Sequence, residues 1–246
     1  MKYAAIDFEV GNGSLVSACS LGLSVFEDFE LVKRGNYLIR PPSSAGKFHW
    51  GNVRIHGIRR QDLIHEPTFD VVWSHLREDI EGSILVCHNA SFDTAVLRAC
   101  LDYFHLPCPE CQYICTVKVS QAVWPAMENH RLNTVANSLG ITLEHHKAGS
   151  DAHACGLILL EALRAAGCAD AVELAQKLKM RLGVLGGTPC QTAEEAGRPP
   201  REERRRRPSR RRSAARSPDG KAPSVKKPSG KGENDHERVF NRPPKH

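Results

Sequence analysis

No segment of this 246-residue sequence has the run of about 20 apolar residues that a membrane-spanning helix needs. A secretory signal peptide does not fit the N-terminus either, because a strand-like pattern already begins at Lys2. The nine cysteines lack the spacing of a disulfide framework, which indicates reduced thiols and a cytoplasmic protein. Cys108 and Cys111 form a close pair with no second pair at matching distance, so the sequence favours two free thiols over a zinc site.

Large apolar side chains are almost absent from residues 191–246. A segment of this composition cannot bury enough apolar surface to offset the entropy lost on ordering, and we predict that it is disordered. It contains 17 Lys and Arg against 8 Asp and Glu, whereas residues 1–190 contain 17 against 20. Its arginine runs, at 204–207 and 210–212, suit two-pronged contacts with phosphates. The tail is expected either to contact nucleic acid or to be a solvated segment that binds polyanions non-specifically.

Residues 1–190 alternate apolar and polar stretches in the way that a globular domain does. Apolar runs bounded by glycine or polar residues predict five strands, at residues 3–8, 15–29, 31–39, 84–87 and 113–116. Helical spacing predicts six helices, at residues 68–80, 91–104, 117–123, 132–139, 151–166 and 171–182. A three-stranded meander followed by alternating helices and strands implies an α/β fold, with a mixed sheet flanked by helices. We expect a domain at 1–168, a C-terminal helix and linker at 169–190, and the disordered tail at 191–246.

Two carboxylates, Asp7 and Glu9, stand two residues apart at the end of the first predicted strand. The two-residue period of a strand places both side chains on the same side. Carboxylates at the mouth of a buried strand are costly unless a cation neutralises them, and hard oxygen ligands favour Mg²⁺ or Mn²⁺ over zinc. The alternative is an exposed strand end with ordinary acidic residues.

Two further acidic residues stand where predicted helices begin. Asp93 ends segment 88–93 (HNASFD), near the strand edge where ligands collect in open α/β sheets. Asp151 opens the helix at 151–166, and His146 precedes it by five residues on a glycine-containing loop. An imidazole that titrates near neutral pH suits proton abstraction from water, although the adjacent His145 leaves a second choice open. Each acid by itself is equally explained by a favourable interaction with the helix dipole.

Together the three segments resemble the motifs of the DnaQ-like 3′→5′ exonuclease superfamily, in its DEDDh branch. The motifs of that family are Asp-x-Glu, His-Asn-x-x-Phe-Asp and His-x4-Asp, and they correspond here to residues 7–9, 88–93 and 146–151. Segments 55–58 (IHGI) and 130–132 (HRL) are also similar to segments of the family. The order of the motifs and the strand or helix expected under each agree over residues 1–166.

The resemblance implies a ribonuclease H-like fold, with a five-stranded mixed sheet and the first strand at its centre. It implies that His146 is the general base and that the products are nucleoside 5′-monophosphates. Two divalent cations, Mg²⁺ or Mn²⁺, are expected on four carboxylates: Asp7, Glu9, Asp93 and Asp151. Contacts with the substrate are expected from Phe8, Val10, His56 and Asn89.

The chain departs from the family just after the first motif. The family often continues with Thr-Thr or Thr-Gly, whereas residues 10–13 here are Val-Gly-Asn-Gly. A hydroxyl that would contact the terminal nucleotide is therefore missing, while the backbone N–H of Val10 remains available to the terminal ribose. Phe92 is expected in the core rather than against a base.

The implied substrate is DNA, with single-stranded 3′ ends as the nucleic-acid partner, as in the proofreading subunit of a bacterial replicative polymerase. A DNA polymerase is an implied partner, and no membrane is. An RNA-trimming or oligoribonuclease-type exoribonuclease is the main alternative, because these motifs do not read the sugar. An alternative of another class is a non-catalytic module that tethers nucleic acid or a polymerase through the arginine-rich tail. The presence of all five catalytic residue types argues against that module.

Overall fold

The computed structural model describes residues 1–186, which form one mixed six-stranded sheet in the order β3-β2-β1-β4-β5-β6. The antiparallel meander consists of β1 (Lys2–Val10), β2 (Ala18–Glu27) and β3 (Glu30–Leu38). β4 (Ile84–Cys87) and β5 (Cys111–Cys115) run parallel to β1, and β6 (Gly183–Leu185) pairs antiparallel with β5. The mixed sheet with an internal first strand is confirmed, but it has a sixth strand that the sequence did not predict.

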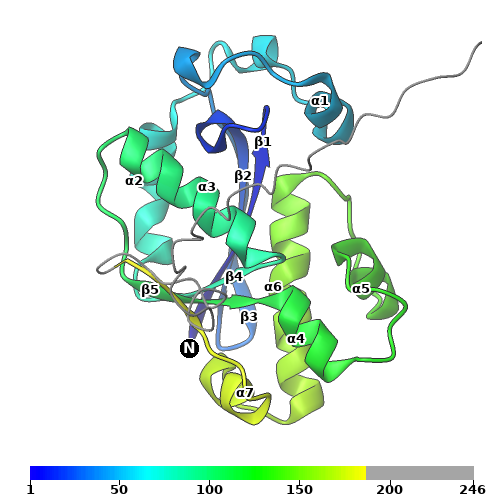
Figure 1. Ribbon diagram of the computed structural model, residues 1–246. Coiled ribbons are helices and arrows are strands. Elements are labelled where there is room, and N and C mark those ends of the chain that lie inside the picture. Colours follow the sequence, from blue (N-terminus) through cyan, green and yellow to red (C-terminus); the bar gives the residue numbers. More distant parts are fainter. Residues whose placement is uncertain (187–246) are drawn as a thin grey trace, which may run out of the picture. The chain divides into compact units, whose positions relative to one another are not determined.

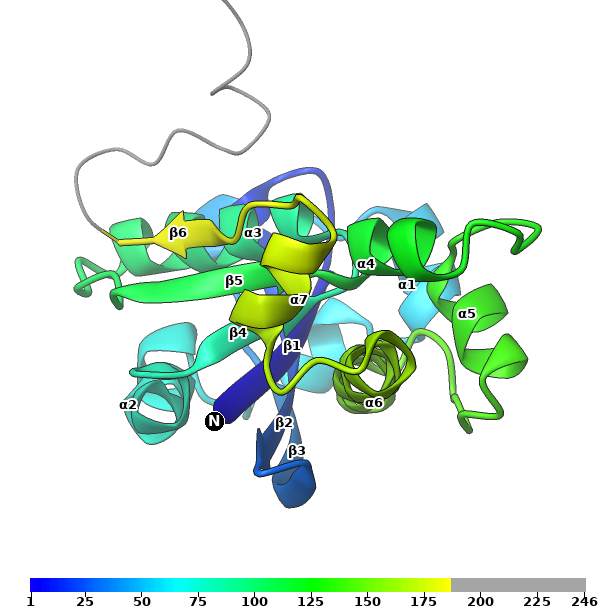
Figure 2. The same ribbon diagram turned by 90° about the horizontal axis from the view of Figure 1, so that it is seen from below.

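Helices cover both faces of this sheet (Figures 1 and 2). α2 (Phe69–Ile80) and α3 (Ala90–Tyr103) pack on one face, together with Ile6 and Phe8 of β1. The other face carries Tyr3 and Ala5 of β1 and four helices: α4 (Thr116–Val123), α5 (Leu132–Ser138), α6 (Ala148–Ala166) and α7 (Ala171–Lys177). The alternation along β1 thus assigns odd-numbered residues to the face of α6. Within residues 1–186 no helix has the length and apolarity required to cross a bilayer.

One helix was not predicted, and two helix boundaries differ from the predictions. The short helix α1 (Trp50–His56) was not predicted, since it buries no residue and has no apolar periodicity to detect. α6 begins at Ala148 rather than at residue 151, because Asn36 Oδ1 of β3 accepts the N–H of Gly149 at 2.9 Å and caps the first turn from another element.

α7 ends at Lys177 rather than at residue 182. The chain turns there because Lys179 adopts a left-handed φ of 54° and the N–H of Met180 donates to Ala175 O at 2.8 Å, which is the usual geometry of a helix C-terminus. Glycine normally marks this turn, so a lysine gave the sequence no stop signal. The segment 169–186 returns to the sheet as β6, whereas the predicted tail at 191–246 lies outside the described residues.

Candidate active site

The end of β1 extends past its parallel neighbour. β4 pairs with β1 only along Tyr3–Ala5, so beyond Ala5 that side of β1 has no strand partner. The N–H of Phe8 donates instead to Asp93 Oδ1 at 3.0 Å, and Asp93 is only 1% exposed in the first turn of α3. The acid of the second motif is thereby fixed against the strand that carries the first motif.

Asp7 and Glu9 occupy odd positions of β1 and face α6. One carboxylate oxygen from each of Asp7, Glu9 and Asp151 lies within 4.8 Å of the others. Asp151 is 2% exposed and is the fourth residue of α6. The structure therefore brings the acids of the first and third motifs into one cluster, with Asp93 bonded beside it.

Two glycines allow α6 to approach the sheet this closely. A Cβ atom on Gly22 of β2 would lie 1.9 Å from the carbonyl oxygen of Ala148, and one on Gly149 would lie 2.9 Å from Cβ of Asn36. Gly22 is the register partner of Asp7 in β2. The backbone contact at Gly22 thus determines how near Asp151 comes to Asp7.

Burial and mutual repulsion disfavour the ionised forms of the four carboxyl groups. Burial raises the pKa of Asp7 well above its ordinary value, and the charges of Asp93, Asp151 and Glu9 raise it further. Burial raises the pKa of Glu9 to about 8, with a further contribution from Asp151, and burial also raises the pKa of Asp93 to about 8. Burial raises the pKa of Asp151 as well. Acids in this state need a cation to be ionised at neutral pH.

The donor set fits a divalent metal ion. All the oxygens are hard carboxylate ligands, which Mg²⁺ and Mn²⁺ prefer. Their mutual distances of up to 4.8 Å are near the span of about 4.2 Å between oxygens on opposite sides of Mg²⁺. The cluster of Asp7, Glu9 and Asp151 therefore needs only a small adjustment to hold such an ion.

Two adjacent histidines meet Asp151 in different ways. His145 Nδ1 lies 3.2 Å from Asp151 Oδ1, whereas the backbone N–H of His146 donates to Asp151 Oδ2 at 2.8 Å. His146 has a φ of 68°, and its ring stacks on that of His145 at 3.8 Å between centroids. Within residues 1–186 the His146 ring makes no hydrogen bond. Burial and the neighbouring His145 lower the pKa of His146, so the ring is neutral and able to accept a proton.

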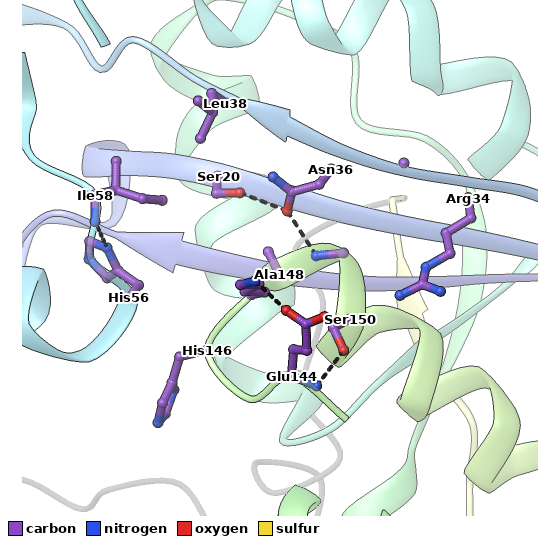
Figure 3. A pocket seen from close by; sticks show the side chains of 13 residues that line it. Ser20, Arg34, Asn36, Leu38, His56, Ile58, Glu144, His146, Ala148 and Ser150 are labelled. Carbon is purple, nitrogen blue, oxygen red and sulfur yellow. Dashed lines mark hydrogen bonds and ion pairs between the residues drawn. The ribbon is translucent and has the colours of Figure 1, made fainter. Parts of the chain in front are cut away.

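A groove of about 420 Å³ opens beside His146. It runs over β2 and β3, with the first turn of α6 and the loop before it along one side and His56 and Ile58 at one end (Figure 3). His56 Nδ1 accepts the N–H of Ile58 at 3.1 Å, and burial lowers the pKa of His56. The structure thus brings His56 and His146, predicted from separate segments, to the same groove.

The other predicted contact residues have different surroundings. The Phe8 side chain is 3% exposed and lies in the core, which argues against the predicted contact between this side chain and a substrate. Val10 ends β1, where Asn52 Nδ2 donates to its carbonyl at 2.9 Å, and Asn89 is exposed at the start of α3 with φ 75°. Phe92 is 37% exposed rather than in the core, because it points away from the sheet when the next residue, Asp93, points in.

His88 in the second motif has a structural role that spacing did not reveal. Its Nδ1 lies 2.9 Å from Thr116 Oγ1 and its Nε2 lies 2.9 Å from the carbonyl oxygen of His130. Burial lowers the pKa of His88 to about 4, so the ring is neutral. His88 therefore ties the end of β4 to α4 and to the HRL segment before α5.

Comparisons with known proteins agree with this architecture. Residues 43–159 match the RNase_T family profile, described as "Exonuclease". The chain is 29% identical to the 3′-5′ exonuclease DinG of Bacillus subtilis over 166 residues, 66% of this chain and 18% of DinG. It is 32% identical to DNA polymerase III subunit epsilon of Treponema pallidum over 142 residues, 55% of this chain and 63% of that subunit.

Among solved structures, Exonuclease X in complex with 5′ overhanging duplex DNA superposes with a TM-score of 0.57 at 22% identity, covering 72% of this chain and 99% of that one. The fold is therefore ribonuclease H-like. The family match and the polymerase III epsilon relative assign the domain to the nuclease class. More particularly, residues 43–159 match the exonuclease family model, and the chain is similar to DnaQ-like exonucleases. The resemblance inferred from the three motifs is confirmed. Because the chain spans less than two thirds of either relative, the likeness concerns the exonuclease domain.

Proposed function

We propose that the protein is a metal-dependent 3′→5′ exonuclease that removes nucleoside 5′-monophosphates from single-stranded DNA. The observation that carries this proposal is the convergence of Asp7, Glu9 and Asp151 within 4.8 Å, with Asp93 bonded to the same strand. These acids come from three distant segments of the chain, and burial and neighbouring charges raise their pKa values. Because such a cluster costs folding free energy, it is typical of a functional site.

Each residue of the site has a proposed role. Asp7, Glu9, Asp93 and Asp151 would hold two divalent cations, Mg²⁺ or Mn²⁺, which when bound activate water and neutralise charge on the departing 3′ oxygen. His146 accepts the proton of the attacking water, because its ring is neutral and has no hydrogen bond to satisfy. The residues proposed to position the terminal nucleotide are Val10, His56 and Asn89.

The decisive experiment digests one single-stranded DNA oligonucleotide labelled at either end, with the full chain and Mg²⁺ or Mn²⁺. The 5′-labelled strand should give a ladder of shortening products, and the 3′-labelled strand should release a labelled mononucleotide at once. EDTA and the variant Asp7→Ala should abolish both patterns. A mononucleotide released first from the 5′ end, or cleavage that survives EDTA, contradicts the proposal.

An exoribonuclease is the second candidate, because the ions that Asp7, Glu9, Asp93 and Asp151 would hold would act on the phosphate and not on the sugar. Digestion of matched DNA and RNA strands of equal length separates the two, and much faster loss of the RNA rejects the DNA assignment. The likeness to a polymerase III epsilon subunit supports a DNA polymerase as a partner and a part in proofreading or repair. A non-catalytic tethering module is excluded by any metal-dependent digestion that Asp7→Ala removes.

A further inference from the structure

The two faces of β3 carry different charges. Lys33 faces α2, where its Nζ lies 2.5 Å from Asp79 Oδ2. Arg34, one residue later, points to the opposite face and lines the groove beside α6. Figure 3 shows Arg34 and His56 at opposite ends of this groove, with Asn36 between them. The strand rises about 13 Å from Leu38 to Arg34, so the groove follows β3 over about that length.

Arg34 forms no ion pair within residues 1–186, although Lys147 and, more weakly, Arg34 lower the pKa of Glu144 in the same groove. The other lysine or arginine in its lining, Lys147, forms an ion pair with Glu144. Within the described part of the chain, Arg34 is exposed and has no hydrogen bond or ion pair.

The part of the groove on β2 and β3 offers hydrogen-bond donors, and the carboxylate that lines the other side, Glu144, is paired with Lys147. Asn36 Oδ1 accepts from Ser20 Oγ at 3.2 Å and from the N–H of Gly149 at 2.9 Å. These two bonds fix the amide, so its NH₂ group is left as a donor without a partner within residues 1–186. Apolar atoms of Leu38, Ile58 and Ala148 complete the lining. Cationic and amide donors beside apolar surface suit a sugar–phosphate backbone.

We infer that this groove binds the single strand upstream of the scissile bond, with a backbone phosphate held by Arg34 in a two-pronged contact. The inference rests on the proposed exonuclease function and adds to it a substrate-binding residue outside the acidic cluster. Residues 1–190 carry a net negative charge, 17 Lys and Arg against 20 Asp and Glu, and the acidic cluster repels a polyanion. A cation in the approach groove offsets that repulsion for the upstream phosphate.

The test compares Arg34→Gln with wild type in the full-length chain. For a single-stranded DNA tetranucleotide, KM should rise about five- to tenfold, which corresponds to the loss of roughly one charge-assisted contact. The value of kcat should stay within about twofold of wild type. The p-nitrophenyl ester of thymidine 5′-monophosphate lacks upstream nucleotides and should be cleaved equally by both proteins. Arg34→Lys should recover part of the affinity. The matched control is Arg77→Ala, which removes an exposed cation from α2 on the opposite face.

A binding assay without catalysis separates the groove assignment from the exonuclease function. Anisotropy of a labelled tetranucleotide in EDTA should show weaker binding to Arg34→Gln, with the slope of log Kobs against log salt smaller by about 0.7. Equal affinity and slope in wild type and Arg34→Gln overturn the groove assignment, whether or not the wild type is active. An equal loss in Arg77→Ala also overturns it, because the effect is then one of net charge. An inactive wild type that still binds through Arg34 rejects the exonuclease function alone.

Discussion

At the scale of single residues, the acidic cluster trades stability for the capacity to bind a cation. The pKa of Asp7 is raised in the fold, so folding takes up a proton at this carboxyl group. Its protonated form contributes stability that is fully present below the unfolded pKa and is lost as the pH rises through the raised folded value. Above that value an ionised Asp7 remains buried among like charges, unless a cation compensates it.

The variant Asp7→Asn should therefore be more stable than wild type in EDTA at pH 8. Asparagine carries no charge and takes up no proton on folding, so the unfolding temperature should rise, by about 2–4 °C for each kcal/mol gained in a domain of this size. Addition of Mg²⁺ should stabilise wild type and leave the variant nearly unchanged, as read by thermal denaturation. Asp62→Asn, which alters an exposed ion pair with Arg59, is the control and should change little. A variant less stable than wild type in EDTA contradicts the electrostatic account.

The two adjacent histidines should differ in their effect on activity. His146→Ala should lower kcat by about 10²–10⁴-fold, as expected for loss of a general base. His145→Ala should cost less than about tenfold, because its ring touches Asp151 but is not proposed to take the proton. Steady-state rates on one oligonucleotide, with circular dichroism to verify folding, provide the measurement. If His145→Ala is the more damaging variant, the assignment of the base is reversed.

At the scale of elements, the site depends on how α6 lies against the β2–β3 hairpin. Gly22 lets the backbone of the first helical turn touch β2, and Asn36 caps that turn from β3. Asp151, three residues into the helix, is thereby held beside Asp7. The contact between a strand and a helix terminus thus determines the distance between the acids of the first and third motifs.

Gly22→Ala should displace the start of α6, because its Cβ would lie 1.9 Å from the carbonyl oxygen of Ala148. Backbone cannot yield as a flexible side chain can, so we expect a loss of about 1–3 kcal/mol in the free energy of unfolding. A shift of the acids by about 1 Å can cost about 10²-fold in kcat. Denaturant unfolding and oligonucleotide cleavage measure the two effects. Gly13→Ala is the matched control, since no atom lies within 4 Å of its added Cβ; equal losses in both variants would refute the packing argument.

At the scale of the whole molecule, charge is divided along the chain. Residues 191–246 have 17 Lys and Arg against 8 Asp and Glu, while the part that contains the site is net negative. We therefore expect the C-terminal segment to provide long-range attraction of a polyanion and the groove to provide short-range positioning. Comparing short with long substrates, and low with high salt, should separate the two contributions to binding.

Truncation after residue 187 should leave tetranucleotide cleavage intact and weaken binding to long single-stranded DNA at low salt. The salt-dependence slope should fall by about 0.7 for each phosphate that the truncated chain no longer neutralises. Fluorescence anisotropy across a salt series, with full-length and truncated chains side by side, measures the slope. An unchanged slope removes the C-terminal segment from the binding surface.

Local patterns in the sequence were sufficient for most of the architecture. The strand at 84–87 and the helices near 68–80, 91–104 and 117–123 were predicted within one residue, because each has a full apolar run or face. The predicted end of α7 was wrong because Lys179 adopts the left-handed turn that glycine usually adopts at a helix C-terminus. The strand β6 was not predicted because a strand of three residues, paired only with β5, is too short to show an alternating apolar pattern.

By itself, the sequence determined that the four acids and His146 stand at element ends, because periodicity and motif order are local properties of the chain. The distances between them were decided only by tertiary structure, since they depend on a backbone contact at Gly22 and a cap supplied by Asn36. The same packing joined Arg34 to the groove beside His146, although the two residues lie more than a hundred positions apart. No local pattern encodes such a pairing, because it follows from which faces of β3 and α6 meet.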